Sequence, residues 1–244
     1  MANKSAQISG IPKLDGLINK LGFTKNGALI VVVGEFGSGR SLFAKQVLGL
    51  PVAQKLYIGT SETSQEIKTG FQAYGWQIED GQLMSIKDNV LEVMGDTKFD
   101  LTIEESKREK IEDKLKDVEV GLEGIVGAIG DNWPRKLISA YSLDSESIED
   151  TKLMSRFMEV MSNYARKQAL VFLNMSEEFA DEIELMNSSA PDMILKLSAE
   201  MSLNKGRPKY HMQILVKARP ECNQTVEYDI SARGIETSNL TRIG

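Results

Sequence analysis

A continuous apolar run followed at once by a glycine-rich loop is the feature that most constrains the fold of this chain. Residues 28–33 read ALIVVV and are mostly β-branched. Such a run predicts a central parallel strand buried on both faces, because a strand with one wet face alternates apolar and polar residues. Residues 34–41 then read GEFGSGRS and fit the phosphate-binding pattern G-x-x-x-x-G-K-[S/T], except that Arg40 stands where the pattern has lysine.

Strand and helix patterns alternate through most of the chain. A helix is predicted over 41–48, directly after the loop, and a capping box of Thr63 and Glu66 opens another over 63–74. The remaining expected elements are strands at 55–59, 83–86, 136–143, 169–173, 193–197, 210–217 and 225–230, and helices at 102–120 and 151–167. This order predicts an α/β fold with a mostly parallel sheet flanked by helices and extended by C-terminal antiparallel strands.

Length and composition favour one globular domain over residues 1–244. The net charge of -6 disfavours a strong binder of duplex DNA, which needs a basic surface. The single cysteine, Cys222, cannot form an intramolecular disulfide, and the N-terminus has no apolar signal segment, so a cytoplasmic protein is expected. The only histidine, His211, falls within a predicted strand, and one histidine with one cysteine offers no zinc site.

Further segments in a fixed order carry a family resemblance. They are 10–17 (GIPKLDGL), 34–48 (GEFGSGRSLFAKQVL), 57–76 (YIGTSETSQEIKTGFQAYGW), 171–177 (VFLNMSE), and Lys217-Ala218-Arg219 with 230–235 (ISARGI). Together they resemble the KaiC branch of the RecA superfamily of P-loop ATPases, which includes archaeal KaiC-like and RadA-paralog ATPases. The resemblance covers nearly the whole chain and implies a RecA-like fold. Residues 88–122 have no counterpart and are expected to be a helical insertion.

The resemblance implies that the glycine-rich loop binds ATP or ADP with Mg²⁺. Backbone N–H groups of such a loop surround the β-phosphate, and the following helix points its N-terminus at the same anion. Glycines suit this loop because the backbone must approach the ligand closely. The expected nucleotide contacts are Gly34, Glu35, Phe36, Gly37, Ser38, Gly39, Arg40, Ser41 and Leu42, with Ser41 also a ligand of Mg²⁺.

Arg40 is the first departure from the family pattern. Arginine keeps the positive charge of lysine but is longer, planar and bulkier, so it does not reproduce the geometry of a lysine in a fitted site. Nucleotide binding through the backbone is therefore expected to survive better than stabilisation of a transition state, which depends on placement.

The turn after the second strand is the second departure. KaiC-like ATPases usually carry adjacent glutamates there, of which the first is thought to polarise the attacking water. This chain has Ser61-Glu62. A hydroxyl cannot accept a proton at neutral pH as a carboxylate does. Glu62 is the remaining candidate catalytic residue and can replace the first glutamate only if the turn directs it to the water. Its structural alternative is a carboxylate at the start of a helix.

The metal-steering aspartate of the family is the third difference. An ungapped comparison over 136–143 places it on Ala140, an interpretation that we favour and that removes one carboxylate from the metal. Asp144 becomes the metal residue if the register is moved by four residues.

Lys217 and Arg219 match a K-x-R motif. In KaiC-like rings this motif reaches the triphosphate of a neighbouring subunit, so the resemblance implies a catalytic role for both cations. Two residues that are two apart on a strand face the same side and can serve one anion. The alternative is a pair of ordinary solvent-facing cations.

These differences concern catalysis and leave the scaffold motifs intact. We therefore favour an ATP-binding protein with weak or no hydrolysis that acts as an oligomeric regulatory or interaction module. The alternatives are a competent, slow Mg²⁺-dependent ATPase and a RadA paralog in DNA recombination.

Overall fold

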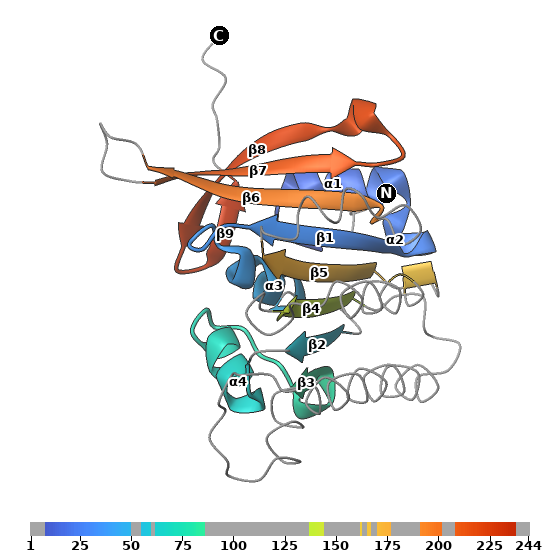
Figure 1. Cartoon of the computed structure of the whole chain (residues 1–244). Coiled ribbons are helices and arrows are strands. Elements are labelled where there is room, and N and C mark those ends of the chain that lie inside the picture. Colours follow the sequence, from blue (N-terminus) through green and yellow to red (C-terminus); the bar gives the residue numbers. More distant parts are fainter. Residues whose placement is uncertain are drawn as a thin grey trace, which may run out of the picture.

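A nine-stranded sheet organises the protein in the computed structural model, in the order β3-β2-β4-β5-β1-β6-β7-β8-β9 (Figure 1). The structure describes residues 8–49, 55–59, 62–85, 137–143, 162, 165–166, 170–176, 191–201 and 208–237. The strands are β1 (Ala28–Gly34), β2 (Lys55–Gly59), β3 (Leu83–Ser85), β4 (Leu137–Leu143), β5 (Leu170–Ser176), β6 (Met193–Met201), β7 (Pro208–Val216), β8 (Gln224–Ser231) and β9 (Gly234–Thr237). From β3 to β6 neighbouring strands are parallel, and β7, β8 and β9 add antiparallel strands. This confirms the predicted fold class.

The described helices are α1 (Pro12–Leu21), α2 (Phe23–Asn26), α3 (Arg40–Gly49) and α4 (Ser64–Gln72), with the short 3₁₀ turns η1 (Asp80–Gln82) and η5 (Pro220–Cys222). The capping box at Thr63 and Glu66 is confirmed, because each side chain bonds the backbone N–H of the other residue. No helix within these described ranges has the length and apolar character required to cross a membrane.

Several boundaries differ from those predicted. The strand predicted at 169–173 continues through Asn174 to Ser176, because this segment pairs with β1 up to Gly34. Helices α1 and α2 and strand β9 were not predicted. The predicted helices at 102–120 and most of 151–167, and the insertion at 88–122, lie outside the described residues.

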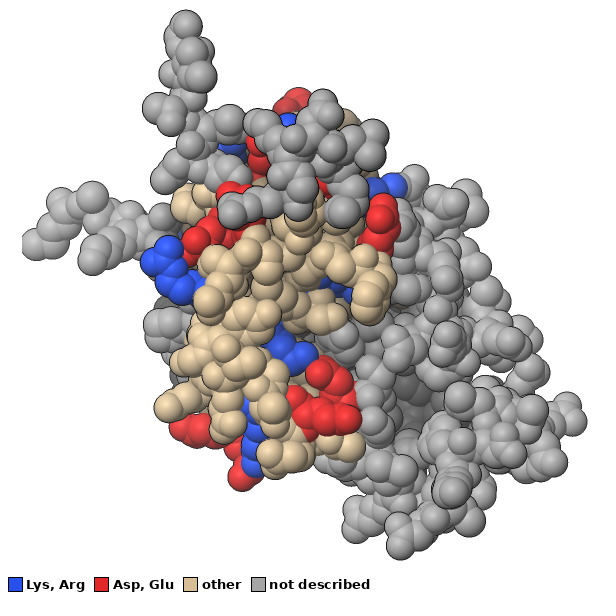
Figure 2. Space-filling model, turned by 90° about the vertical axis from the view of Figure 1, so that its left-hand side faces the viewer, with Lys and Arg blue, Asp and Glu red and all other residues tan. Residues whose placement is uncertain are grey.

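The parallel strands give the sheet two distinct edges. Their arrowheads point to one side of the molecule in Figure 1, and the loop between β1 and α3 lies on that side. Figure 2 views this carboxyl edge, where the visible described surface carries acidic and basic side chains interspersed. The amino edge, on the opposite side, holds the beginning of β1 and the end of β7.

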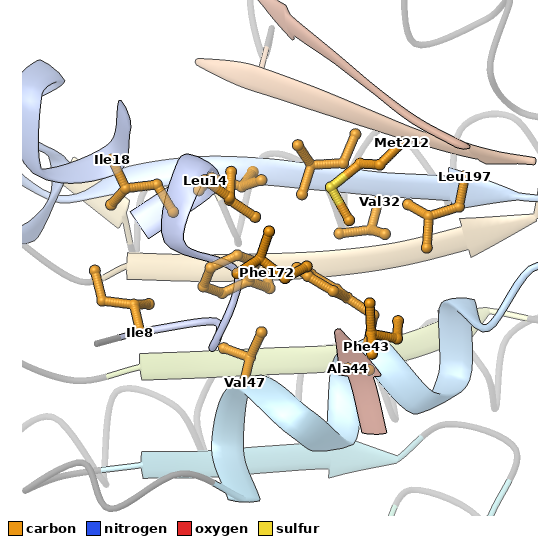
Figure 3. Packing of buried hydrophobic residues seen from close by; sticks show 14 of the residues in the cluster. Ile8, Leu14, Ile18, Val32, Phe43, Ala44, Val47, Phe172, Leu197 and Met212 are labelled. Carbon is orange, nitrogen blue, oxygen red and sulfur yellow. The ribbon is translucent and has the colours of Figure 1, made fainter. Parts of the chain in front are cut away.

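All residues of β1 are buried, which confirms the central strand predicted from its apolar run. One apolar cluster joins this strand to α1 and α3, so both helices cover the same face of the sheet (Figure 3). Within it, the ring of Phe43 from α3 meets Phe172 of β5 edge to face, with centroids 5.9 Å apart. Helix α3, which follows the glycine-rich loop, is thereby packed against the sheet.

The buried amide of Gln46 connects α3 to both ends of the described chain. Its Nε2 donates to the carbonyl oxygens of Ser9 (2.7 Å) and Ile235 (2.9 Å), and its Oε1 accepts from the N–H of Ile235 (2.6 Å). Ser9 in turn donates its N–H and its hydroxyl to the buried carboxylate of Asp15, both at 2.7 Å. One side chain therefore joins the segment before α1 and strand β9 to the helix after the loop.

Replacing Gln46 with leucine tests this junction. The substitution Gln46→Leu leaves the polar groups of Ser9 and Ile235 without their amide partner, at about 1–3 kcal/mol for each buried group. We expect the free energy of unfolding, measured by chemical denaturation, to fall by at least about 3 kcal/mol. Gln72→Leu, at the exposed end of α4, is the matched control and should change it by less than about 0.5 kcal/mol. Equal values for the two variants would contradict a structural role for the amide.

Candidate nucleotide site

The glycine-rich loop occupies residues 35–39, between β1 and α3. Gly37 and Gly39 adopt φ angles of 85° and 84°, in the left-handed region that residues with a Cβ seldom adopt. The N–H of Ser38 donates to the carbonyl of Glu35 (3.2 Å), and the N–H of Phe43 donates to Gly39 (2.8 Å). The loop therefore turns sharply and passes directly into the first turn of α3.

The backbone of this loop suits an anion. Within the described part of the chain, the N–H groups of Gly37 and Gly39 donate to no protein acceptor. A Cβ on Gly37 would meet no atom within 4 Å, so the space beside it is open. The hydroxyl of Ser38 is buried and has no hydrogen-bond partner among the described residues. Unpaired N–H groups beside the N-terminus of a ten-residue helix form the kind of site that binds phosphate.

The predicted contact residues do not share one environment. Gly34, Ser38 and Leu42 are buried, Gly39, Arg40 and Ser41 are partly buried, and Glu35, Phe36 and Gly37 are exposed. Gly34 is closely enclosed, because a Cβ there would lie 2.7 Å from the backbone oxygen of Leu197 in β6. Phe36 is fully exposed at the tip of the loop. The loop is thus held at its two ends and open in its middle.

Tyr228 of β8 is a buried residue that contacts the loop. Its hydroxyl donates to the backbone carbonyl of Ser38, and its ring is buried and stacks on Tyr210 with centroids 5.4 Å apart. Burial, with a smaller contribution from Tyr210, raises the pKa of Tyr228 above its usual range. Like that of an ordinary tyrosine, its hydroxyl is protonated at neutral pH and able to donate.

Glu62 is held by other side chains. Its carboxylate accepts from the Lys45 ammonium at 2.8 and 3.0 Å and from the Tyr57 hydroxyl at 3.0 Å. The Lys45 ammonium also lies 5.7 Å from the centre of the Tyr57 ring, and the stem of Lys45 passes Gly70 of α4, where a Cβ would lie 2.6 Å from its Cε. Both carboxylate oxygens of Glu62 are therefore engaged by the protein. Ser61 lies outside the described residues.

Lys217 and Arg219 lie at the other edge of the sheet. Both are exposed and follow the end of β7, in a turn where the N–H of Arg219 donates to Val216 (3.2 Å). The prediction that they share one face of a strand is therefore wrong. The N–H of Lys217 donates to Asp192, whose own N–H donates to Leu29 at the start of β1. The seven residues of β1, about 20 Å at 3.3 Å per residue, separate these cations from the loop of the same chain.

The register of β4 bears on the metal position. Ala140 pairs with Leu173, which pairs with Val31, three residues before the end of β1. On its other side Ala140 pairs with Ile58, one residue before the end of β2. The placement of the family aspartate on Ala140 or Asp144 therefore stays a prediction. A bulge follows, because Leu143 pairs with Met175. Asp144, the other candidate, lies outside the described residues.

Other predicted or polar residues have structural surroundings. His211 of β7 lies 3.9 Å from the carboxylate of Glu200 on the neighbouring strand. Asn174 of β5 is completely buried and level with Val32 of β1. No group of three or more His, Cys, Asp or Glu side chains within the described ranges is placed to hold a metal ion.

Sequence reasoning missed Lys45, Gln46, Tyr57 and Tyr228. The first two had a detectable signal, because Lys45 follows Leu42 by three residues and Gln46 follows Phe43 by three, so both share the inward side of the predicted helix. Tyr57 and Tyr228 gave no such signal, since tyrosine is common in strands.

Comparison with known proteins agrees with this architecture. Residues 8–239 match the family model described as "ATPase: KaiC". The chain belongs to the KaiC ATPase family. The solved structure of the KaiC-like protein PH0186, from the hyperthermophilic archaeon Pyrococcus horikoshii OT3, is similar to this chain with a TM-score of 0.58 and 14% sequence identity. The similarity covers 95% of this chain and 98% of the PH0186 chain. That likeness shows a shared KaiC-like fold. No curated protein sequence matches the chain.

The pair of Lys45 and Glu62 can be measured by a double-mutant cycle in this KaiC-family protein. The side chains are 8% and 22% exposed, so we expect Lys45→Met and Glu62→Gln to be coupled by about 1.5–3 kcal/mol in the free energy of unfolding. The exposed pair of Arg233 and Glu236 is the control and should show coupling below about 1 kcal/mol. Additive effects of the two substitutions at Lys45 and Glu62 would contradict the interaction.

Proposed function

We propose that this chain binds ATP or ADP with Mg²⁺ at residues 34–42, hydrolyses ATP weakly or not at all, and acts as an oligomeric regulatory or interaction module. KaiC-like ATPases generally bind these nucleotides with Mg²⁺ and often form oligomers. Binding is supported by the open loop, in which Gly37 and Gly39 present N–H groups without protein acceptors. Ser41, at the start of α3, would hold Mg²⁺, and the metal with the loop would neutralise phosphate charge.

Weak hydrolysis is supported above all by the engagement of Glu62. A general base needs an oxygen within hydrogen-bond reach of the water that it activates. Both oxygens of Glu62 already accept hydrogen bonds, from Lys45 and Tyr57, and this arrangement ties the carboxylate to α3 and β2. Arg40 adds a second reason, since its planar group differs in placement from the ammonium of lysine.

A competent, slow ATPase is the second candidate function. A metal carboxylate at Asp144, which follows the last residue of β4 in the sequence, would support it. A role as a RadA paralog and a cytoplasmic location both stay predictions.

Calorimetry with Mg-ATP, followed by measurement of phosphate release, tests binding and hydrolysis separately. We expect wild type to bind nucleotide and to release phosphate slowly. Arg40→Lys should raise the rate by about tenfold or more, because one well-placed donor is worth this much in a transition state. Arg233→Lys, in an exposed turn, is the control and should leave the rate unchanged.

Two results would count against the proposal. Rapid phosphate release by wild type refutes weak hydrolysis and leaves nucleotide binding in place. A failure to bind Mg-ATP at millimolar concentration refutes nucleotide binding itself.

The oligomeric part of the proposal draws on the two edges of the sheet. Lys217 and Arg219 are separated from the loop of their own chain by the length of β1, which supports action on the nucleotide of another copy. Such contacts are heterologous, since one surface of each copy meets a different surface of the next.

A double variant, Lys217→Ala with Arg219→Ala, tests action between copies. We expect sedimentation to show nucleotide-dependent assembly of wild type and its weakening in the variant, while dilute monomers of both bind Mg-ATP equally. The control Lys13→Ala with Lys20→Ala removes two exposed cations from α1 and should assemble normally. Loss of nucleotide affinity in monomers of the first variant would place the cations in their own site and contradict the proposal.

A further inference from the structure

Among the described residues, one hydrogen bond joins the antiparallel strands β7, β8 and β9 to the loop, and it is made to the peptide between Ser38 and Gly39. The bond comes from Tyr228, whose hydroxyl donates to the Ser38 carbonyl. The ring of Tyr228 is 1% exposed and is fixed by stacking on Tyr210, with an angle of 26° between the two planes. The donor is therefore rigid, and it reaches a loop 190 residues earlier in the chain.

The next residue, Gly39, is packed against the same strands. Gly39 lies against β8 and β9, because a Cβ there would be 2.8 Å from Cδ1 of Ile230 and 3.6 Å from Cδ1 of Ile235. The helix after the loop is joined to β9 by Gln46. The carbonyl of Ser38 thus faces a packed surface, which leaves no room for a side chain at position 39.

The geometry of a peptide bond converts this contact into an orientation of Gly39. The described chain contains no cis peptide bond, and in a trans peptide the carbonyl and the following N–H point in opposite directions. The Ser38 carbonyl points to Tyr228, so the Gly39 N–H points away from it. That N–H donates to no protein acceptor within the described residues.

An anchor is needed because the loop would otherwise rotate this peptide easily. Gly37 and Gly39 flank Ser38, and glycine populates positive and negative φ with similar ease. A rotated peptide would turn a carbonyl oxygen toward the anion and so replace attraction by repulsion.

We propose that Tyr228 is a positioning residue that holds the Ser38–Gly39 peptide with its N–H directed at a nucleotide phosphate. The inference rests on the proposed nucleotide binding at residues 34–42 and adds a residue from β8 to that site.

The substitution Tyr228→Phe tests the inference, because it removes the hydroxyl and keeps the ring that stacks on Tyr210. We expect the Kd for Mg-ADP, measured by calorimetry, to rise about 3- to 10-fold, the range for one net hydrogen bond. Tyr210→Phe is the matched control, since no hydrogen bond of its hydroxyl is seen among the described residues, and its Kd should equal that of wild type. Thermal unfolding should show that both variants remain folded.

A second measurement needs no nucleotide. In protein labelled with ¹⁵N-glycine, the amide resonance of Gly39 should move in Tyr228→Phe and stay in place in Tyr210→Phe. An unmoved resonance, or a Tyr228→Phe variant that binds Mg-ADP as wild type does, overturns the inference. If the resonance moves while wild type binds no nucleotide, the proposed function fails and the positioning of the peptide by Tyr228 stands.

Discussion

The hydrogen bonds of the Gln46 amide are the interaction on which the rest of the structure most depends. This side chain belongs to α3, the helix that follows the glycine-rich loop, and it bonds the backbone before α1 and the backbone of β9. Buried polar groups are in most cases paired, so these hydrogen bonds favour this packing of the three segments. Trp76 packs against the same junction, because a Cβ on Gly49 or Gly234 would lie within 3.0 Å of its ring. Segments that carry the family resemblance separately in the sequence are thus in contact around Gln46.

The same arrangement explains why the loop keeps its form although residues linked to catalysis differ. Contacts with β8 and β9 fix Ser38 and Gly39 through backbone and apolar groups, and none of these contacts involves Arg40. On the other side of α3, Lys45 holds Glu62 without using the loop. The loop and Glu62 are therefore held by different sets of contacts, and one set can change while the other persists.

Much of the fold was predictable because its signals are local. The apolar run of β1, the glycine pattern and the capping box of α4 each lie within a few neighbouring residues. The partners of Gln46 and Tyr228 lie 189 and 190 residues away, and no local pattern connects them. The bulge in β4 between Ala140 and Leu143 likewise leaves no mark in the sequence. The end of β7 does carry a sequence signal in Pro220, since proline cannot continue a central strand.

The distance along the chain between Gln46 and Ile235 has a consequence for how this protein is made. The helix after the phosphate loop is synthesised early, yet its buried amide finds its last partners only when strand β9 emerges. Contacts between residues so far apart form late and slow folding, because a long loop must close first. During synthesis the glycine-rich loop therefore exists for most of the time without strands β8 and β9, which pack against it. A chain that stops before Gly234 lacks the contacts of β9 with the loop and with α3 even though every residue of the loop is present.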